Sequence, residues 1–204
     1  MEKKNTNTDS LAKLLQKRWS PRQFDDQQIS KKTIFQIFDA GKTSMSCFNE
    51  QPWRVILASK DDPHYNKLFE CLTSGNQQWV QTAPFLGVVL VKKHFSKKDK
   101  ENRHRFYDSG AFMAFSTLKA VSLGLFIHQM AGFSVEKVHQ NFPIPDEFEA
   151  ITCFVIGHAA NLNTLSKEQR KQEQKRSPRK PVNHFLFGDQ WDESYLDASN
   201  ISSD

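Results

Sequence analysis

Two short basic segments, far apart in the chain, have a composition that suits binding of a phosphate monoester. Residues 17–22 are KRWSPR and residues 175–180 are KRSPRK, so each combines Arg with Ser and a Pro that fixes the backbone. Guanidinium groups form paired, charge-assisted hydrogen bonds with phosphate oxygens, and a hydroxyl adds one more donor. A third basic run spans residues 92–105. For any one of these segments alone, a charge run that merely solvates the surface is the simpler interpretation.

Motifs for several other chemistries are missing from the sequence. Residues 40–43, AGKT, resemble the end of a phosphate-binding P-loop, but Gln36 stands where its first glycine is required. The chain has no G-x-G-x-x-G, no H-E-x-x-H, no G-x-S-x-G, and no C-x-x-C among its three cysteines. These absences argue against a P-loop, a Rossmann dinucleotide site, a nucleophilic serine elbow and a zinc site, so no metal is expected.

The composition indicates one folded domain. With 204 residues, of which 38% are hydrophobic and 17 are Phe, the chain can bury a sizeable core. Residues 1–10 lack the apolar segment of a secretory signal, and Lys119 and His128 interrupt the longest mainly apolar stretch. We therefore expect a soluble, cytoplasmic protein with a disordered segment 1–9, a domain 10–188 and an acidic arm or tail 189–204.

The hydrophobic pattern alternates between helical and extended segments, which predicts an α+β fold. Asp9 or Ser10 is expected to cap a first helix, Ser30 a second and Ser134 a short one. Residues 105–123 are apolar on nearly every side, which is typical of a buried central helix or of a helix in a subunit interface. Further helices are predicted at 65–72 and 77–82, a polar helix or linker at 167–175, and strands at 55–58, 85–91, 125–130 and 150–157.

The order of these segments resembles that of one enzyme family. RWSPR, then a helix, then SMSCFNEQPW resembles the amino-terminal signature of the FMN-dependent nitroreductase family, whose matching residues here are Arg18, Ser20, Arg22, Ser46, Asn49, Gln51, Pro52 and Trp53. The similarity continues in order through residues 78–84, 108–125, 130–133, 156–157 and 179–181, and covers about residues 10 to 188. It implies a three-layer α+β fold in which helices flank a central mixed sheet, assembled as an intertwined homodimer.

The resemblance also implies a set of flavin-binding residues. Arg18, Ser20 and Arg179 would bind the FMN phosphate, with Trp19 in the same turn, and Arg22 would lie toward the pyrimidine edge of the isoalloxazine. Asn76 would hydrogen-bond the ring, and the backbone at Ala131 and Gly132 would face flavin N5. Ser46 and Asn49 would come from the second subunit. Met45 and Cys47 depart from the family pattern, in which a proline and a second serine are often found.

The activity implied is that of a ping-pong oxidoreductase in which the flavin, and no protein acid or base, carries the chemistry. NADH or NADPH would deliver hydride to flavin N5, and a nitroaromatic, a quinone or a similar small molecule would accept the electrons. No nucleic-acid or membrane partner is expected. The alternatives are a flavin-binding or regulatory protein without turnover, a flavin-destroying or dehalogenating relative, and a weak nucleic-acid binder that uses residues 92–105.

Overall fold

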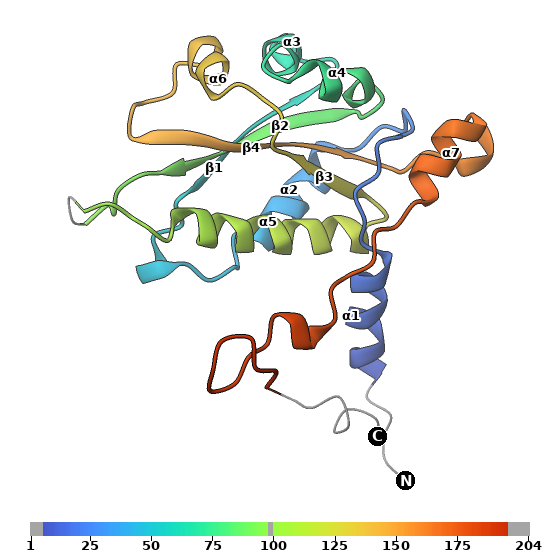
Figure 1. Cartoon of the computed structure of the whole chain (residues 1–204). Helices are drawn as coiled ribbons and strands as arrows, with labels where there is room; N and C mark the ends of the chain where they lie inside the picture. The colour runs from blue at the N-terminus through green and yellow to red at the C-terminus, as the bar shows by residue number, and fades with distance from the viewer. Residues whose placement is uncertain (1–5, 98–99, 196–204) are drawn as a thin grey trace.

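Helices cover both faces of a four-stranded sheet in the computed structural model, which describes residues 6–97 and 100–195 (Figure 1). The strands are β1 (Trp53–Ser59), β2 (Phe85–Lys92), β3 (Phe126–Met130) and β4 (Phe148–Gly157), in the order β1-β2-β4-β3. The helices are α1 (Thr6–Lys17), α2 (Lys31–Gly41), α3 (Tyr65–Phe69), α4 (Ser74–Val80), α5 (Arg105–Ser122), α6 (Val135–Asn141) and α7 (Lys167–Gln174), with short 3₁₀ turns η1 (Cys47–Asn49), η2 (Leu162–Thr164) and η3 (Val182–His184).

The layers are clear in Figure 1, where α3, α4 and α6 lie on one face of the sheet and α2 and α5 lie on the other. The predicted three-layer α+β fold is therefore confirmed. No helix in the described part of the chain has the length and apolarity needed to span a bilayer.

All three strand pairs are antiparallel, whereas the resemblance implied a mixed sheet. The connections explain the difference. The N–H of Lys60, just after β1, donates to the carbonyl of Pro84, just before β2, over 3.1 Å. The chain therefore enters β2 at the end where it left β1, and β2 runs back along its neighbour.

Local sequence signals set several helix starts. The hydroxyl of Ser30 accepts the N–H of Thr33, and the hydroxyl of Ser134 accepts the N–H of Lys137, as the predicted caps require. The first helix differs from its prediction, because α1 begins at Thr6 and already contains both Asp9 and Ser10.

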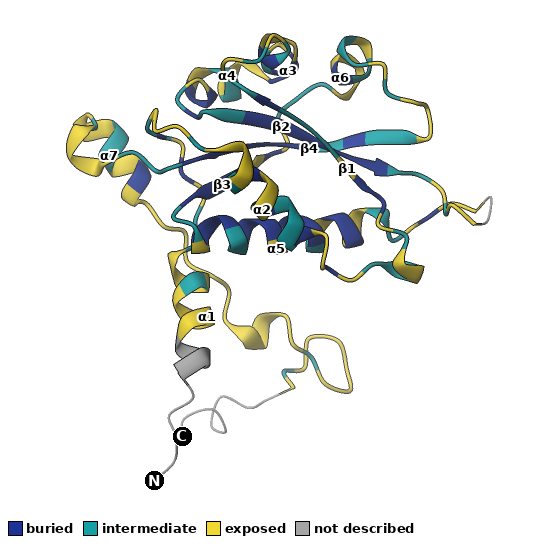
Figure 2. Cartoon of the chain, turned by 180° about the vertical axis from the view of Figure 1, so that it is seen from behind, coloured by how far each residue is buried: buried dark blue, intermediate teal, exposed yellow. Residues whose placement is uncertain are grey.

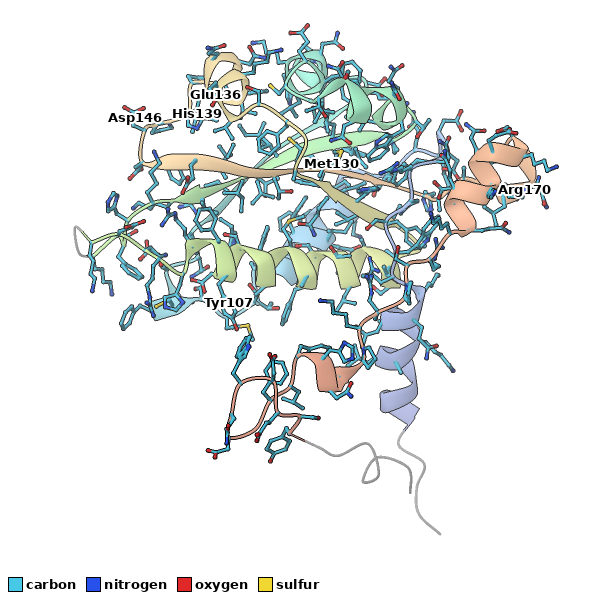
Figure 3. All side chains as sticks on the ribbon, viewed as in Figure 1. Tyr107, Met130, Glu136, His139, Asp146 and Arg170 are labelled. Carbon is cyan, nitrogen blue, oxygen red and sulfur yellow. The ribbon has the colours of Figure 1, made fainter. Side chains whose placement is uncertain are left out.

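The core consists of two apolar clusters on the two faces of the sheet. One lies beneath α3, α4 and α6, and the other lies between the sheet, α2 and α5. The predicted burial of α5 holds for one side, where Phe112 and Met113 are buried. On its other side Phe106, Tyr107 and Phe115 remain exposed, and Figure 3 shows Tyr107 directed away from the sheet. Figure 2 shows that α1 and the segment after α7 are also largely exposed.

Candidate functional site

The two basic segments noted in the sequence meet in space. Burial lowers the pKa of Arg18, and the positive charges of Arg179 and Arg176 lower it further. Among the residues described, no carboxylate lies at ion-pair distance from any of these three guanidinium groups. Among the described residues the three guanidinium groups gather positive charge without a direct ion pair, which is what an anion-binding site requires; Glu173 is the acidic side chain whose charge interacts with Arg176.

Trp19 orients one of these cations. Its ring packs edge-on against Phe126 at the start of β3, with the centroids 6.0 Å apart. The guanidinium carbon of Arg176 lies 3.6 Å from the centroid of the same ring. Arg176 was not among the predicted site residues, although it belongs to the second basic segment. Ser20, the remaining predicted phosphate ligand, is exposed in the adjoining turn.

Helix α7 fixes the turn that carries these residues. The buried carboxylate of Glu173 accepts the backbone N–H of Arg22 over 2.9 Å, and Gln169 Nε2 donates to Gln23 Oε1 over 3.2 Å. Burial raises the pKa of Glu173, while the backbone N–H groups of Arg22 and Gln23 and the positive charges of Arg176 and Arg22 oppose that rise. The sequence predicted only a polar helix or a linker here. Neither contact could be predicted, because its two partners lie far apart in the sequence and no local pattern links them.

A cavity of about 490 Å³ lies beside this turn. It is bounded by the turn, by α4 and by the end of β3 with the residues that follow. Its lining residues are Arg22, Thr73, Gly75, Asn76, Trp79, His128, Gln129, Met130, Ala131 and Gly132. Four of the predicted flavin-binding residues, Arg22, Asn76, Ala131 and Gly132, thus line one cavity.

Gly132 lies in the wall of that cavity, where its backbone closely approaches Thr73 and Asn76. Its carbonyl accepts the N–H of Thr73 (3.0 Å), the Thr73 hydroxyl (3.1 Å) and Asn76 Nδ2 (2.9 Å). A Cβ at this position would lie 2.6 Å from Asn76 Nδ2 and 2.8 Å from Thr73 Oγ1, so a larger residue would break the contact. One role of Asn76 is therefore to hold the 131–132 backbone against α4.

His128 is a further cavity residue. Its Nδ1 lies 2.7 Å from the carbonyl oxygen of Pro21, so Nδ1 carries the proton and the neutral ring presents Nε2 as an acceptor. The imidazole packs 4.5 Å from the Trp79 ring, and the Arg22 guanidinium carbon lies 5.9 Å from the centroid of that indole. Burial lowers the pKa of His128, the Pro21 bond raises it, and the Arg22 charge lowers it. In the sequence, a single His within an apolar strand gives no sign that it lines a cavity.

Ser46 and Asn49 lie far from the other predicted residues within one chain. Their loop is attached to the first turn of α5, where the Cys47 N–H donates to Asp108 Oδ2 over 3.0 Å. Trp19, next to Arg18, packs on Phe126 just beyond the opposite end of α5, which at 1.5 Å per residue is about 27 Å long. Figure 1 shows the loop and α7 at opposite sides of the molecule. One chain therefore does not bring Ser46 and Asn49 to the cavity.

The Ser46 loop has an unusual backbone. Phe48, Asn49 and Gln51 all have positive φ, at 52°, 56° and 50°. This conformation places Phe48 outward, and the residue is 87% exposed. Separately, no group of three or more His, Cys, Asp or Glu side chains suited to a metal ion occurs in the described part of the chain.

Comparison with known proteins gives a consistent result. The sequence model of the Nitroreductase family matches residues 15–72 and 59–158, well over half of the chain. An uncharacterised 15.4 kDa protein from the ask 5′ region of Mycolicibacterium smegmatis is 28% identical over 134 residues, covering 66% of this chain and 88% of that protein.

Solved structures extend the similarity. An oxidoreductase described as containing FMN has a TM-score of 0.81 at 29% identity, over 87% of this chain and 91% of that one. A nitroreductase-like protein from Desulfovibrio desulfuricans in complex with FMN has a TM-score of 0.69 at 19% identity, over 94% and 99% of the two chains. A nitroreductase family protein from Streptococcus pneumoniae TIGR4 has a TM-score of 0.72 at 15% identity, over 87% and 98%. The last two show a shared fold.

Proposed function

Because this chain belongs to the nitroreductase family, we propose that it is an FMN-dependent oxidoreductase. The observation that carries the proposal is the meeting of Arg18, Arg176 and Arg179, without a carboxylate counter-ion among the described residues, near a cavity that holds Gly132. FMN consists of a dianionic phosphate joined to a flat, partly polar ring. The arginines fit the first part, and the cavity with its backbone edge fits the second.

The residues of the phosphate end have distinct tasks. Arg18 and Arg179 supply paired donors to the phosphate oxygens, and Ser20 adds a hydroxyl in the same turn. Trp19 holds Arg176 by its ring face, and Glu173 holds the backbone of Arg22. An anion bound here relieves the mutual repulsion of the three guanidinium groups.

At the ring end, bound FMN supplies the capacity to accept a hydride at N5 and to pass two electrons on. The chain provides orientation and charge around that group. Asn76 and Thr73 hold the carbonyl of Gly132, which fixes the backbone of residues 131–132 at the cavity wall. Arg22 places a cation there, and a cation favours negative charge on a reduced ring.

A second copy of the chain completes the site in this proposal. Ser46 and Asn49 belong to the loop attached to the first turn of α5, whereas Trp19, next to Arg18, packs on Phe126 just beyond the other end of this helix, which is about 27 Å long. The outer face of α5 exposes Phe106, Tyr107 and Phe115, and apolar faces of this kind mark interaction surfaces. A homodimer packed through this face would cover these rings and bring the Ser46 loop of one chain toward the cavity of the other.

The proposed reaction is two-step. NADH or NADPH would give up a hydride and leave as NAD⁺ or NADP⁺, and a nitroaromatic, a quinone or a similar acceptor would then take the two electrons at the same place, with the proton of the hydride and a further proton from solvent. No side chain need act as acid or base in the hydride step, so binding and orientation are the protein's contribution.

The proposal is tested by loading the protein with FMN, removing free flavin on a desalting column and recording the visible spectrum. A yellow protein that bleaches anaerobically with NADH or NADPH, and regains colour when a quinone or nitroaromatic is added, is the expected result. A protein that retains no flavin refutes the proposal. Retained flavin that neither nucleotide bleaches would instead identify a flavin-binding protein without turnover.

Variants locate the flavin. The double variant Arg18→Ala, Arg179→Ala should abolish FMN retention. It removes one arginine that binds the phosphate from the turn and the other from the second basic segment. Arg103→Ala with Lys171→Ala removes the same amount of charge from two exposed positions elsewhere, and should retain stoichiometric flavin. Full retention in the first variant would show that the phosphate binds somewhere else.

A further inference from the structure

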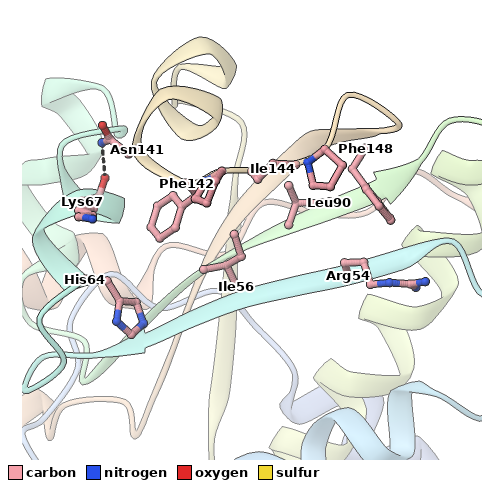
Figure 4. Close-up of a pocket in the computed structure, with 11 residues that line it drawn as sticks. Arg54, Ile56, His64, Lys67, Leu90, Asn141, Phe142, Ile144 and Phe148 are labelled. Carbon is pink, nitrogen blue, oxygen red and sulfur yellow. Dashed lines mark hydrogen bonds between the residues drawn. The ribbon is translucent and has the colours of Figure 1, made fainter.

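A second cavity lies on the α3 and α6 face of the sheet and shares no residue with the flavin cavity. We call it the β1–α6 groove; it has a volume of about 590 Å³ and is lined from β1 by Arg54 and Ile56. Leu90 of β2 joins them, and the segment that follows α6 supplies the opposite wall (Figure 4). We propose that this groove binds a small amphipathic carboxylate, with the anion at Arg54 and an apolar tail along the strands.

The floor of the groove is apolar. Arg54 and Ile56 are two residues apart in β1, so they share the sheet face that carries α3 and α6. Leu90 pairs directly with Arg54 in the sheet register. Phe142, Ile144 and Phe148 stand above these side chains and are only partly buried, so they offer surface to an apolar tail.

The wall is held in place before any ligand binds. Pro143 and Pro145 restrict the backbone on either side of Ile144. One end of the wall is fixed by Asn141 Nδ2, which donates to the carbonyl of Lys67 over 2.9 Å. At the other end, the Lys93 ammonium donates to the carbonyl of Asp146 over 2.7 Å. A preformed groove loses little conformational entropy on binding, which favours a small ligand.

Backbone carbonyls and the Phe148 ring hold the guanidinium of Arg54 in place. Its Nη1 donates to the carbonyls of Gln51 (3.1 Å) and Trp53 (2.7 Å), and its guanidinium carbon lies 5.5 Å from the Phe148 ring centroid. A guanidinium has five N–H donors, so the edge formed by Nε and Nη2 can still take a carboxylate in a paired geometry.

The surrounding charges leave this cation without an acidic partner. Among the described residues, no carboxylate lies at ion-pair distance from Arg54 or from Lys67 at the other end of the groove. The two acidic side chains that flank Phe148 pair with other cations, Glu147 with Lys92 and Glu149 with Arg105. A ligand with one negative end and one apolar end is complementary to this pattern.

The test titrates the ¹⁵N-labelled full-length protein with sodium octanoate, follows backbone amide shifts, and measures affinity by calorimetry. Shifts confined to β1, β2 and residues 141–148 are the expected result. Arg54→Gln should weaken octanoate binding about tenfold. Lys67→Gln removes a cation from the other end of the groove. It should change the affinity for octanoate by less than about twofold. Neutral 1-octanol should bind wild type and Arg54→Gln equally.

A second variant guards against a folding artefact. Ile144→Asp places a negative charge at a partly buried position in the wall of the groove, outside the sheet, and should abolish octanoate binding while the remaining amide spectrum stays native. Octanoate that shifts no groove amide, or that binds Arg54→Gln as tightly as wild type, overturns the proposal. Octanoate that changes only the monomer–dimer balance also overturns it, because a second copy would then cover the groove. Flavin retention measured on the same samples is independent of all these outcomes.

Discussion

Arg18, Arg176 and Arg179 repel one another, yet the surrounding residues keep them close. Trp19 holds Arg176 through its ring face, and the buried Glu173 carboxylate fixes the backbone of Arg22 in the same turn. Among the described residues the three guanidinium groups form no direct ion pair, so their charge stays available to a ligand. At this scale the chemistry depends on a few side chains whose partners are distant in sequence.

The pKa of His128 predicts a pH dependence of stability. Burial places this pKa below that of an unfolded His, about 6.5, so the unfolded chain binds more protons between the two values. The free energy of unfolding should therefore fall as the pH is lowered from about 6.5 to the pKa of His128 in the folded protein. Below that pKa, His128 should cause no further change in the free energy of unfolding. In His128→Gln this part of the loss disappears, as urea unfolding at pH 7.5 and at successively lower pH would show.

His184→Gln is the matched control, because it alters an exposed imidazole. It should keep the wild-type decrease of stability between the same pH values. An unchanged decrease in His128→Gln would mean that His128 does not cause it.

At the scale of elements, the contact between α2 and α5 sets the layer beneath the sheet. Gly41 ends α2 at a point of close contact with α5, since a Cβ there would lie 2.2 Å from Ser116 Oγ and 2.8 Å from the Phe112 ring. Ser116 is fully buried and its hydroxyl donates to the Phe112 carbonyl over 2.9 Å, so it has little room to move. The same helix α5 positions the Ser46 loop through Asp108.

Gly41→Ala should therefore destabilise the fold by about 1–3 kcal/mol, because the added methyl group forces the helices apart. Urea unfolding of the protein without flavin measures the change. Gly75→Ala, in α4, adds a methyl group with no atom within 4 Å and should be neutral or stabilise by up to about 1 kcal/mol. Equal stability of the two variants would show that the α2–α5 contact tolerates the extra atom.

At the scale of the whole molecule, a single chain leaves several large aromatic side chains exposed to solvent. Phe106, Tyr107 and Phe115 are exposed on α5, and Phe185 and Trp191 are exposed in the segment after α7. The Ser46 loop is attached to the first turn of α5, whereas Trp19, next to Arg18, packs on Phe126 just beyond the other end of α5. Both observations support the proposed homodimer, in which the two ends of different chains would meet.

We predict that the protein sediments as a dimer of about twice 23.6 kDa. Tyr107→Asp with Phe115→Asp should raise the dimer dissociation constant at least about tenfold, because two charges would be buried without partners. Analytical ultracentrifugation over a range of concentrations measures this constant, and flavin retention should fall with dimer content. Leu162→Asp, at an exposed position near α7, is the control. A wild-type monomer that retains FMN would exclude a shared site.

The sequence by itself determined the local features of this protein. Ser30 and Ser134 cap their helices as expected, and the run at 85–91 forms a strand buried on both faces, because capping and hydrophobic periodicity act within a few residues. The ordered motifs also predicted the family and the three-layer fold. The start of α1 at Thr6 and the antiparallel sheet were not foreseen, since chain-end extension and strand direction depend on packing and on connections.

Only the tertiary structure decided which distant groups meet. Arg176 joins Arg18, Glu173 fixes Arg22, and His128 lies between Pro21 and Trp79, over separations of tens to more than a hundred residues. The β1–α6 groove likewise arises where two strands face the segment after α6. No local pattern encodes such meetings, because they follow from how the helices pack on the sheet, and that packing depends on the whole chain at once.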